Sequence, residues 1–302
     1  MVSSRNELRA HIHRIMEIIL QPDLTAIIQQ NIAAALAEDL RDGDLTAQLL
    51  PADRVATARL ITRQHAILCG TAWFEACFRA LDAHCQIHWH AQEGDAISPN
   101  QTLCDIRGNA RALLTAERSA LNLLQTLSGT ATRTRLYADR VAGIPVKIMD
   151  TRKTLPSLRM AQKYAVRVGG GHNQRIGLFD GILIKENHIA AAGGIAEVLA
   201  QAFQLAPAGV SIQIEVENLT ELEQALNAGA TLILLDNFDL NGLRAAVQLT
   251  AGRAELEASG GITLDTLRDI ALTGVDRISI GTLTKDLDSV DFSLRIIDNG
   301  SI

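Results

Sequence analysis

The stretch 211-SIQIEVENLTELEQALNAGATLILLDN-237 contains two short apolar runs that end in acidic side chains, with a segment of helical periodicity between them. Runs of this kind are typical of parallel β-strands that are joined by a crossover helix. The stretch therefore predicts a βαβ unit, and with it an α/β fold.

The same rhythm continues on both sides of this stretch. Further short apolar runs are 147-KIMD-150, 181-GILIKEN-187, 254-AELEASGG-261 and 277-RISIG-281. Polar or glycine residues follow the apolar part of every run, namely Asp150, Lys185, Glu215 with Glu217, Asp236, Ser259-Gly260-Gly261 and Gly281. A barrel gathers such strand ends at one mouth, whereas an open doubly wound sheet uses only those near a switch point. Because only six strands are clear, the pattern favours a barrel that lacks some of the usual eight strands.

The residues before this rhythm predict a smaller α+β unit. The predicted elements are a helix over 24–40, two strands within 55–70, a helix near 71–82, and strands near 85–91 and 101–107. From Arg111 to about Ala142 the pattern is strongly helical, and Ser128-Gly129 predicts a break in it. The chain has 302 residues, of which 47% are apolar and 3% aromatic, and this composition suits helices packed on parallel strands.

No segment predicts export or membrane insertion. The apolar run Ile15–Leu20 is short, contains Glu17, and is followed by no small-residue cleavage site. No run approaches the roughly 20 apolar residues that span a bilayer. We therefore expect a cytoplasmic protein that does not bind membranes.

The cysteine and histidine patterns predict no metal centre. Four cysteines, at 69, 77, 85 and 104, form no C-x-x-C pair, and we expect reduced thiols that pack in the interior. His88 and His90 share one face of a predicted strand, but no third ligand follows at a recognisable spacing. We expect these histidines to lie on a solvated strand face.

Positive charge is concentrated in one part of an acidic chain. The formal net charge is −6, yet residues 111–185 contain 13 Lys/Arg and 4 Asp/Glu, a balance of +9 that leaves −15 for the remainder. Aromatic residues are sparse among these cations, and the acidic remainder would repel a polyanion, so a nucleic-acid partner is not expected. A recessed site for small anions explains the cluster better.

The residues at the strand ends have the chemistry of a phosphorylated-sugar site. Arg152, Lys153, Arg175 and Lys185 are suited to multiply charged anions. Glu215 and Asp236 end successive strands, and such acids hold magnesium or accept hydrogen bonds from ribose hydroxyls. Backbone N–H groups around Ser259, Gly260, Gly261 and Gly281 suit phosphate. Neither a Ser-His or Cys-His pair nor a G-x-x-x-x-G-K-[ST] loop is apparent, so pentose-phosphate transfer by positioning and electrostatics fits best.

Seven stretches resemble one family in sequence order. They are 117-ERSALNLLQTLSGTAT-132, 150-DTRKTLP-156, 169-GGGHNQR-175, 181-GILIKENHI-189, 215-EVEN-218, 235-LDN-237 and 259-SGGI-262, within a match from about residue 30 to 295. The chain resembles the quinolinate phosphoribosyltransferases. The resemblance implies that quinolinate and phosphoribosyl pyrophosphate give nicotinate mononucleotide, carbon dioxide and pyrophosphate in NAD biosynthesis, with magnesium and without an organic cofactor.

The resemblance also implies an architecture and residue roles. It implies an incomplete, about seven-stranded α/β barrel over 129–283 and an N-terminal α+β domain over 1–128, onto which the tail 284–302 packs back. Arg152 and Arg175 would bind the quinolinate carboxylates, while Lys153 and Lys185 would contact the charges of the substrates. Glu215 and Asp236 would serve the ribose hydroxyls and magnesium. Arg118 would reach the neighbouring subunit's site, which implies a homodimer and leaves a hexamer open.

One position departs from the family, and two rival interpretations stay open. The family commonly has Asn-His-Arg where this chain has Asn173-Gln174-Arg175, and an amide carries no charge and shuttles no proton near neutral pH. The rivals are the quinolinate-transferase-like protein associated with molybdenum transport operons and a non-catalytic phosphate-ligand-binding barrel. The intact arginine set argues against the first. The presence of Lys153, Lys185, Glu215 and Asp236 argues against the second.

Overall fold

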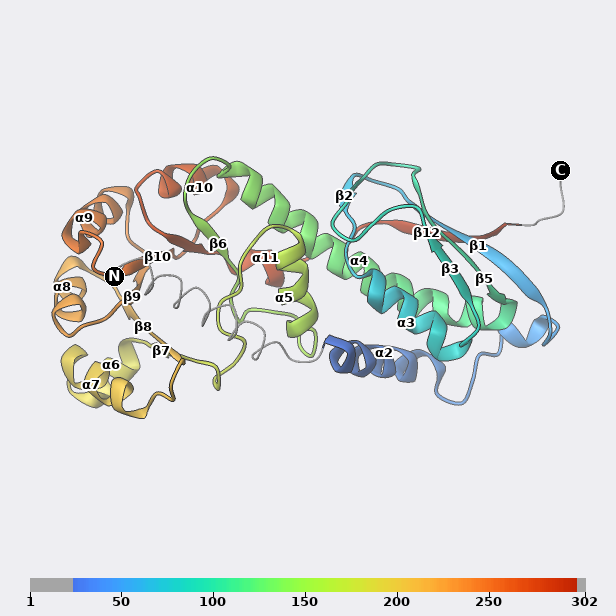
Figure 1. Cartoon of the computed structure of the whole chain (residues 1–302), viewed down its shortest axis with the longest axis horizontal. Helices are drawn as coiled ribbons and strands as arrows, with labels where there is room; N and C mark the ends of the chain where they lie inside the picture. The colour runs from blue at the N-terminus through green and yellow to red at the C-terminus, as the bar shows by residue number, and fades with distance from the viewer. Residues whose placement is uncertain (1–23, 298–302) are drawn as a thin grey trace, which may run out of the picture.

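A computed structural model describes residues 24–297, which fold into two units that lie side by side and share one long helix, α4 (Figure 1). The apolar run Ile15–Leu20 and the last residues of the tail lie outside this described range. None of the helices within residues 24–297 is long and apolar enough to cross a membrane.

The first unit is a four-stranded antiparallel sheet that packs against helices. Its elements are α2 (Leu24–Leu40), η1 (Ala47–Leu49), β1 (Val55–Thr62), β2 (Ala66–Ile67), α3 (Thr71–Leu81), β3 (Gln86–Trp89), β4 (Ala96–Ile97), β5 (Thr102–Asn109) and β12 (Phe292–Ile297). The sheet has the order β12-β1-β5-β3, and β2 pairs with β4 in a separate two-stranded sheet. The α+β prediction for this part of the chain is confirmed. The sequence missed the short strand β4, which lies between the strands predicted near 85–91 and 101–107.

The last strand returns to the first unit after the chain has passed through the second. β12 pairs antiparallel with β1, from Thr57 opposite Ile297 to Thr62 opposite Phe292. This pairing brings the last strand of the described chain beside the first strand, and β12 lies beside β1 at the right of Figure 1.

The long helix α4 (Ala110–Arg140) corrects one prediction. It begins at the cap residue Asn109, whose side chain accepts a hydrogen bond from Ala112 N, and it runs without a break through Ser128-Gly129. The predicted break is wrong because Gly129 serves close packing: a Cβ at this position would collide with the backbone oxygen of Asp288. The proposed domain boundary at residue 128 stays a prediction, since this helix belongs to both units.

The second unit is a parallel sheet that curls into an unclosed barrel with helices on its outside (Figure 1). Its elements are β6 (Lys147–Met149), α5 (Arg159–Val168), β7 (Gly181–Ile184), α6 (Glu186–Ala192), α7 (Ile195–Leu205), β8 (Ser211–Val216), α8 (Leu219–Asn227), β9 (Leu232–Asp236), α9 (Leu240–Thr250), β10 (Glu255–Ser259), α10 (Leu264–Ala271), β11 (Arg277–Ser279) and α11 (Thr282–Lys285). The strand order is β6-β11-β10-β9-β8-β7. The six strands found by their apolar runs are therefore confirmed.

A single residue continues the barrel beyond β6. His172 forms an isolated parallel bridge with Met149, donating to Ile148 O at 2.7 Å and accepting from Asp150 N at 3.0 Å. His172 thus lies where a seventh strand between β6 and β7 would run. Within the described residues, no backbone pairing joins His172 to β7. The barrel is therefore incomplete, as predicted.

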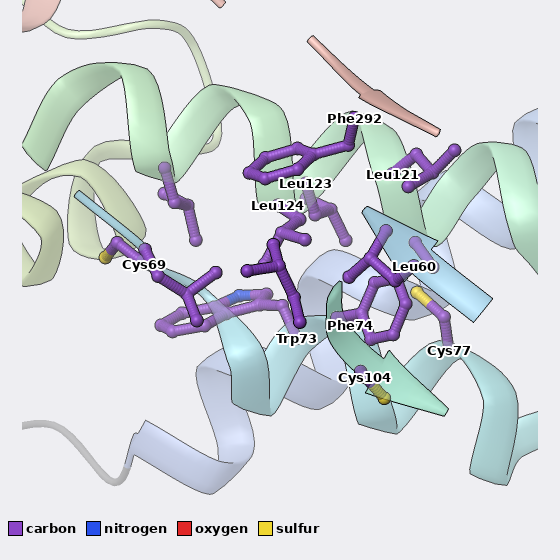
Figure 2. Packing of buried hydrophobic residues seen from close by; sticks show 14 of the residues in the cluster. Leu60, Cys69, Trp73, Phe74, Cys77, Cys104, Leu121, Leu123, Leu124 and Phe292 are labelled. Carbon is purple, nitrogen blue, oxygen red and sulfur yellow. The ribbon is translucent and has the colours of Figure 1, made fainter. Parts of the chain in front are cut away.

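Two separate apolar cores stabilise the two units. In the first, Trp73 and Phe74 of α3 pack against Leu124 of α4 and Leu60 of β1, as Figure 2 shows. All four cysteines are free and buried, and burial raises the pKa of Cys77 and Cys104 to about 12. These thiols stay protonated at neutral pH, which confirms the prediction of packing thiols. The second core lies between the barrel strands and their helices.

Candidate active site

The parallel strands bring most of the predicted site residues to one end of the barrel. The apolar residues Ile184, Val216, Leu235, Ala258 and Ile280 pack outward against the helices. Because successive side chains in a strand point to opposite faces, their neighbours at the strand ends point to the barrel interior. These neighbours are Lys185, Glu215, Asp236, Ser259 and Gly281.

Lys185 and Glu215 form an ion pair across two neighbouring strands. Lys185 Nζ lies 2.6 Å from Glu215 Oε2, and the Glu215 side chain is 10% exposed while that of Lys185 is 44% exposed. The backbone N–H of Lys185 donates to His188 Nδ1 at 3.0 Å, which fixes the first turn of α6. The pair places one positive and one negative group at the mouth, with the lysine facing solvent.

Asp236 lies beside Glu215 but closer to the rim. Glu215 is in register with Leu234, so Asp236 extends one inward-facing position further along the neighbouring strand. Asp236 Oδ2 accepts from Asn237 Nδ2 at 2.7 Å. The expected adjacency of these two carboxylates is therefore a feature of the strand register.

The loop after β10 requires glycine. Asn237 N donates to Ser259 O at 3.0 Å, which joins the ends of β9 and β10. Gly260 has φ +106°, and a Cβ there would collide with Asn237 Oδ1. The first turn of α10 is already capped by Thr263, which accepts from Thr266 N. The N–H groups of the loop itself are therefore better placed for a phosphate than those of the helix.

Lys153 and Gly281 meet at the other side of the mouth. A Cβ at Gly281 would lie 3.0 Å from Lys153 Cδ and 3.8 Å from its Nζ, so glycine leaves room for the lysine chain. The backbone oxygen of Lys153 accepts from Thr284 Oγ1 at 2.8 Å, which ties this loop to α11. Lys153 is exposed at the mouth.

Arg152 and Arg175 are close enough for their positive charges to interact. Neither forms an ion pair within residues 24–297, and the buried Nε of Arg152 has no hydrogen-bond partner there. Arg175 Nη1 donates to Gly181 O at 2.9 Å. Burial first, and then the positive charge of Arg152, lowers the pKa of Arg175 from its ordinary value. The charge of Asp180 opposes this shift but does not outweigh it. Two neighbouring guanidinium groups of this kind suit a bound anion.

Asp150 supports this site from below and does not line its open mouth. Its fully buried carboxylate accepts from Lys163 Nζ at 2.5 Å, Asn173 Nδ2 at 2.6 Å and Gln174 N at 2.8 Å. Burial raises the pKa of Asp150, and it lowers the pKa of Lys163. Asp150 was expected among the residues of the mouth, and the structure corrects this: it anchors the loop that carries Arg175.

Arg118 is not brought to this mouth by its own chain. It is exposed on the N-terminal half of α4, whereas the C-terminal half of the same helix contacts the barrel, for example through Arg133, whose Nη1 donates to Thr282 O at 3.3 Å. Fifteen residues of helix separate the two arginines, which is about 22 Å at the usual rise.

Two polar residues inside the barrel escaped the sequence analysis. Gln213 and Glu257 are buried, and Glu257 accepts hydrogen bonds from Gln213 and Gln174. Each stands two residues before a residue of the mouth, on the same face of its strand. Polar side chains at inward positions of otherwise apolar strands are a signal that could have identified them.

An incomplete barrel whose mouth carries cations, carboxylates and glycine loops defines a protein that binds small polyanions at its strand ends. The family described as quinolinate phosphoribosyl transferase matches both units, with its N-terminal domain over residues 44–128 and its C-terminal domain over residues 130–295. The chain therefore belongs to the quinolinate phosphoribosyl transferase family.

Individual relatives agree with this assignment. A probable carboxylating nicotinate-nucleotide pyrophosphorylase of Bacillus subtilis is 42% identical, over 88% of this chain and 92% of the relative. A chloroplastic carboxylating nicotinate-nucleotide pyrophosphorylase of Arabidopsis thaliana is 38% identical, over 91% of this chain and 83% of the relative. The solved nicotinate-nucleotide pyrophosphorylase of Francisella tularensis is 44% identical with a TM-score of 0.87, over 90% of this chain and 96% of that one. The chain is an enzyme of this family.

Proposed function

We propose that the protein transfers the phosphoribosyl group of phosphoribosyl pyrophosphate to quinolinate, and that nicotinate mononucleotide, carbon dioxide and pyrophosphate are its products. The observation that carries the proposal is the neighbouring pair Arg152 and Arg175, which lacks a carboxylate partner within the described residues at the mouth of this family's barrel. A pyridine with two carboxylates supplies the negative charge that these guanidinium groups need. Names of the relatives agree with this reaction.

Quinolinate binding is assigned to the cationic side of the mouth. Arg152 and Arg175 bind the two carboxylates, because a guanidinium offers a planar fork of donors that matches a carboxylate. Lys153 and Lys185 add mobile positive charge toward both substrates. The closeness of Lys153 to Gly281, and of Lys185 to Glu215, supports these assignments.

The sugar phosphate is assigned to the carboxylates and glycine loops beside these cations. Glu215 and Asp236 accept hydrogen bonds from the ribose hydroxyls, and the loop groups of Ser259, Gly260, Gly261 and Gly281 contact phosphate. No group of three or more His, Cys, Asp or Glu residues suited to a metal occurs within residues 24–297. Magnesium commonly binds through one or two carboxylates plus substrate phosphates, so Glu215 and Asp236 fit an ion that is shared with the pyrophosphate. When bound, that ion would neutralise the charge of the leaving group.

The chemistry needs positioning and charge, without a protein nucleophile. The bond between ribose C1 and pyrophosphate breaks, pyrophosphate leaves with the electron pair, and the pyridine nitrogen forms the new bond to C1. Glu215 and Asp236 stabilise the positive charge that develops on the ribose. The bond from ring C2 to its carboxylate then breaks, the electron pair stays on C2 beside the cationic nitrogen, and a proton from solvent replaces carbon dioxide.

Activity with the two substrates tests the proposal directly. Purified protein with quinolinate, phosphoribosyl pyrophosphate and Mg²⁺ should release carbon dioxide and nicotinate mononucleotide in equal amounts. A chelator should abolish turnover, and added Mg²⁺ should restore it. Binding of either substrate without product would instead indicate a non-catalytic ligand-binding barrel. Equal turnover of nicotinate, which has no second carboxylate, would contradict the roles of the two arginines.

We also propose a homodimer in which Arg118 completes the partner's site. Its exposure and its distance along α4 from its own mouth support this arrangement. Arg118→Ala and Arg175→Ala should each lose most of their activity alone. After mixing and reassembly of equal amounts, activity should return to about a quarter of wild type, because half of the dimers are mixed and each of these has one intact site. If mixing restores no activity, Arg118 does not act across subunits. A cytoplasmic location stays a prediction from the sequence.

A further inference from the structure

A carboxylate without a cationic partner lies inside the barrel, one layer below the mouth. Glu257 is fully buried in β10 and stands two residues before Ser259, so its Cα lies about 6.6 Å deeper along the strand. It forms no ion pair within the described residues, whereas Glu255, a further two residues down the same strand, pairs with Lys147 and Arg277. A buried carboxylate requires hydrogen bonds, and neutral amides supply those of Glu257.

Two glutamines surround this carboxylate. Gln174 Nε2 lies 2.6 Å and 2.7 Å from the two oxygens of Glu257, and Gln213 Nε2 lies 3.0 Å from Oε2. Gln174 Nε2 also donates to Gln213 Oε1 at 3.0 Å. An ionised carboxylate only accepts hydrogen bonds, so both amides must turn their NH₂ groups toward it. The carboxylate therefore decides the orientation of the Gln174 amide.

That orientation has a consequence for the neighbouring arginine. With its nitrogen toward Glu257, Gln174 presents Oε1 to the backbone N–H of Arg175, which donates to it at 3.2 Å. The backbone N–H of Gln174 is held from the other side by Asp150. Two buried carboxylates thus hold this part of the backbone. Asp150 accepts directly from the N–H of Gln174, and Glu257 acts on the N–H of Arg175 through the Gln174 amide.

We propose that Glu257 is a positioning residue for Arg175. It acts through Gln174, whose amide it holds in the one orientation that satisfies the Arg175 N–H, and so keeps the guanidinium aimed at its anion. This proposal rests on the proposed function, in which Arg175 binds a quinolinate carboxylate. It also gives Gln174 a role that needs neither charge nor proton transfer.

Glu257→Gln tests the proposal with almost no change in volume. The new side chain has one acceptor oxygen and one NH₂ group. Gln174 Nε2 lies within 2.7 Å of both carboxylate oxygens, so it faces the new NH₂ group in either orientation. This repulsion should turn the Gln174 amide and withdraw its oxygen from Arg175 N. We expect the KM for quinolinate to rise about tenfold, as one lost hydrogen bond of this kind implies, and the KM for phosphoribosyl pyrophosphate to change by less than about twofold. If Glu257→Gln does not fold, Gln174→Ala is the second test, because it removes the amide between Glu257 and Arg175 N and leaves Glu257 bonded to Gln213. It should likewise raise the KM for quinolinate and leave the KM for phosphoribosyl pyrophosphate nearly unchanged.

Glu255→Gln is the matched control, because Glu255 has the same chemistry on the same face of the same strand. Within the described residues its carboxylate pairs with Lys147 and Arg277 and not with Gln174. It should leave both KM values unchanged. An equal rise in both KM values for Glu257→Gln, or a quinolinate effect as large for Glu255→Gln, would overturn the proposal.

Hydrogen exchange separates this proposal from the proposed function, because it needs no substrate. The amide of Arg175 should exchange faster in Glu257→Gln than in wild type and be unchanged in Glu255→Gln. Wild type that is inactive on quinolinate, together with faster exchange in the variant, would refute the proposed function and retain the positioning contact. Active wild type with unchanged exchange and kinetics in Glu257→Gln would refute the positioning role alone.

Discussion

Arg175→Ala should lower kcat/KM for quinolinate by about 30- to 1,000-fold while the protein stays folded. The range corresponds to about 2–4 kcal/mol, the usual cost of losing one partner of a desolvated charge contact. The loss should be large because Arg175 is partly buried, so little water can take the place of its guanidinium group beside the bound carboxylate. Steady-state kinetics with quinolinate varied at saturating phosphoribosyl pyrophosphate would measure it.

The fold should tolerate this change. Arg175 makes one side-chain hydrogen bond that joins it to another strand, from Nη1 to Gly181 O, and no ion pair within the described residues. Removing the guanidinium also removes its repulsion with Arg152, which offsets part of the lost contact.

Arg175→Lys and Arg253→Ala are the two controls. The lysine variant keeps the charge without the planar fork and should be intermediate in kcat/KM. Arg253 is an exposed arginine that contacts only backbone oxygens at the end of α9, so its removal should leave the kinetics unchanged. Unchanged constants in Arg175→Ala, or a loss confined to phosphoribosyl pyrophosphate, would contradict the assignment.

The rim of this site was predictable because strand topology fixes it. Apolar runs that end in Lys185, Glu215, Asp236 and Ser259 imply parallel strands, and parallel strands place all of their ends at one edge. No knowledge of side-chain contacts is needed for that step.

The layer beneath the rim was not predictable in the same way. Asp150 ends its strand as Asp236 does, yet it is buried because Lys163, thirteen residues later on α5, turns inward to meet it. Burial of a lysine depends on which helix face packs on the barrel, and a lone polar residue in an amphipathic segment does not reveal it. Glu257 and Gln213 were hidden for a related reason, since their partner Gln174 comes from a loop.

At Gly129 the local sequence signal predicted a helix break that does not occur. Ser-Gly within a helical pattern predicts a break, but helix α4 has packing on both of its ends to stabilise it. The glycine is needed for the approach of the backbone at Asp288. Tertiary contact decided the structure against the local propensity.

Asp150→Asn should lower the free energy of unfolding by about 3–5 kcal/mol, the second large effect that we expect. The substitution keeps the shape but leaves Lys163, which is 1% exposed, as a buried cation. Within residues 24–297 its remaining hydrogen-bond partner is Gln174 O at 2.9 Å. Urea unfolding followed by circular dichroism would measure the loss. An unchanged midpoint would show that the pair contributes little to stability.

The pH dependence of that variant should identify the cause. Burial already lowers the pKa of Lys163, and loss of the Asp150 charge removes the main opposing influence. Between the folded-state pKa and the unfolded value near 10.4, the unfolded chain then binds one more proton than the folded chain, so stability must rise with pH. The deficit relative to wild type should thus be smaller at pH 9 than at pH 7. The double variant Asp150→Asn/Lys163→Met buries no charge at this pair, so its stability should recover in part and this pH dependence should vanish. Its activity should stay low, because the N–H of Gln174 has lost the carboxylate that holds it.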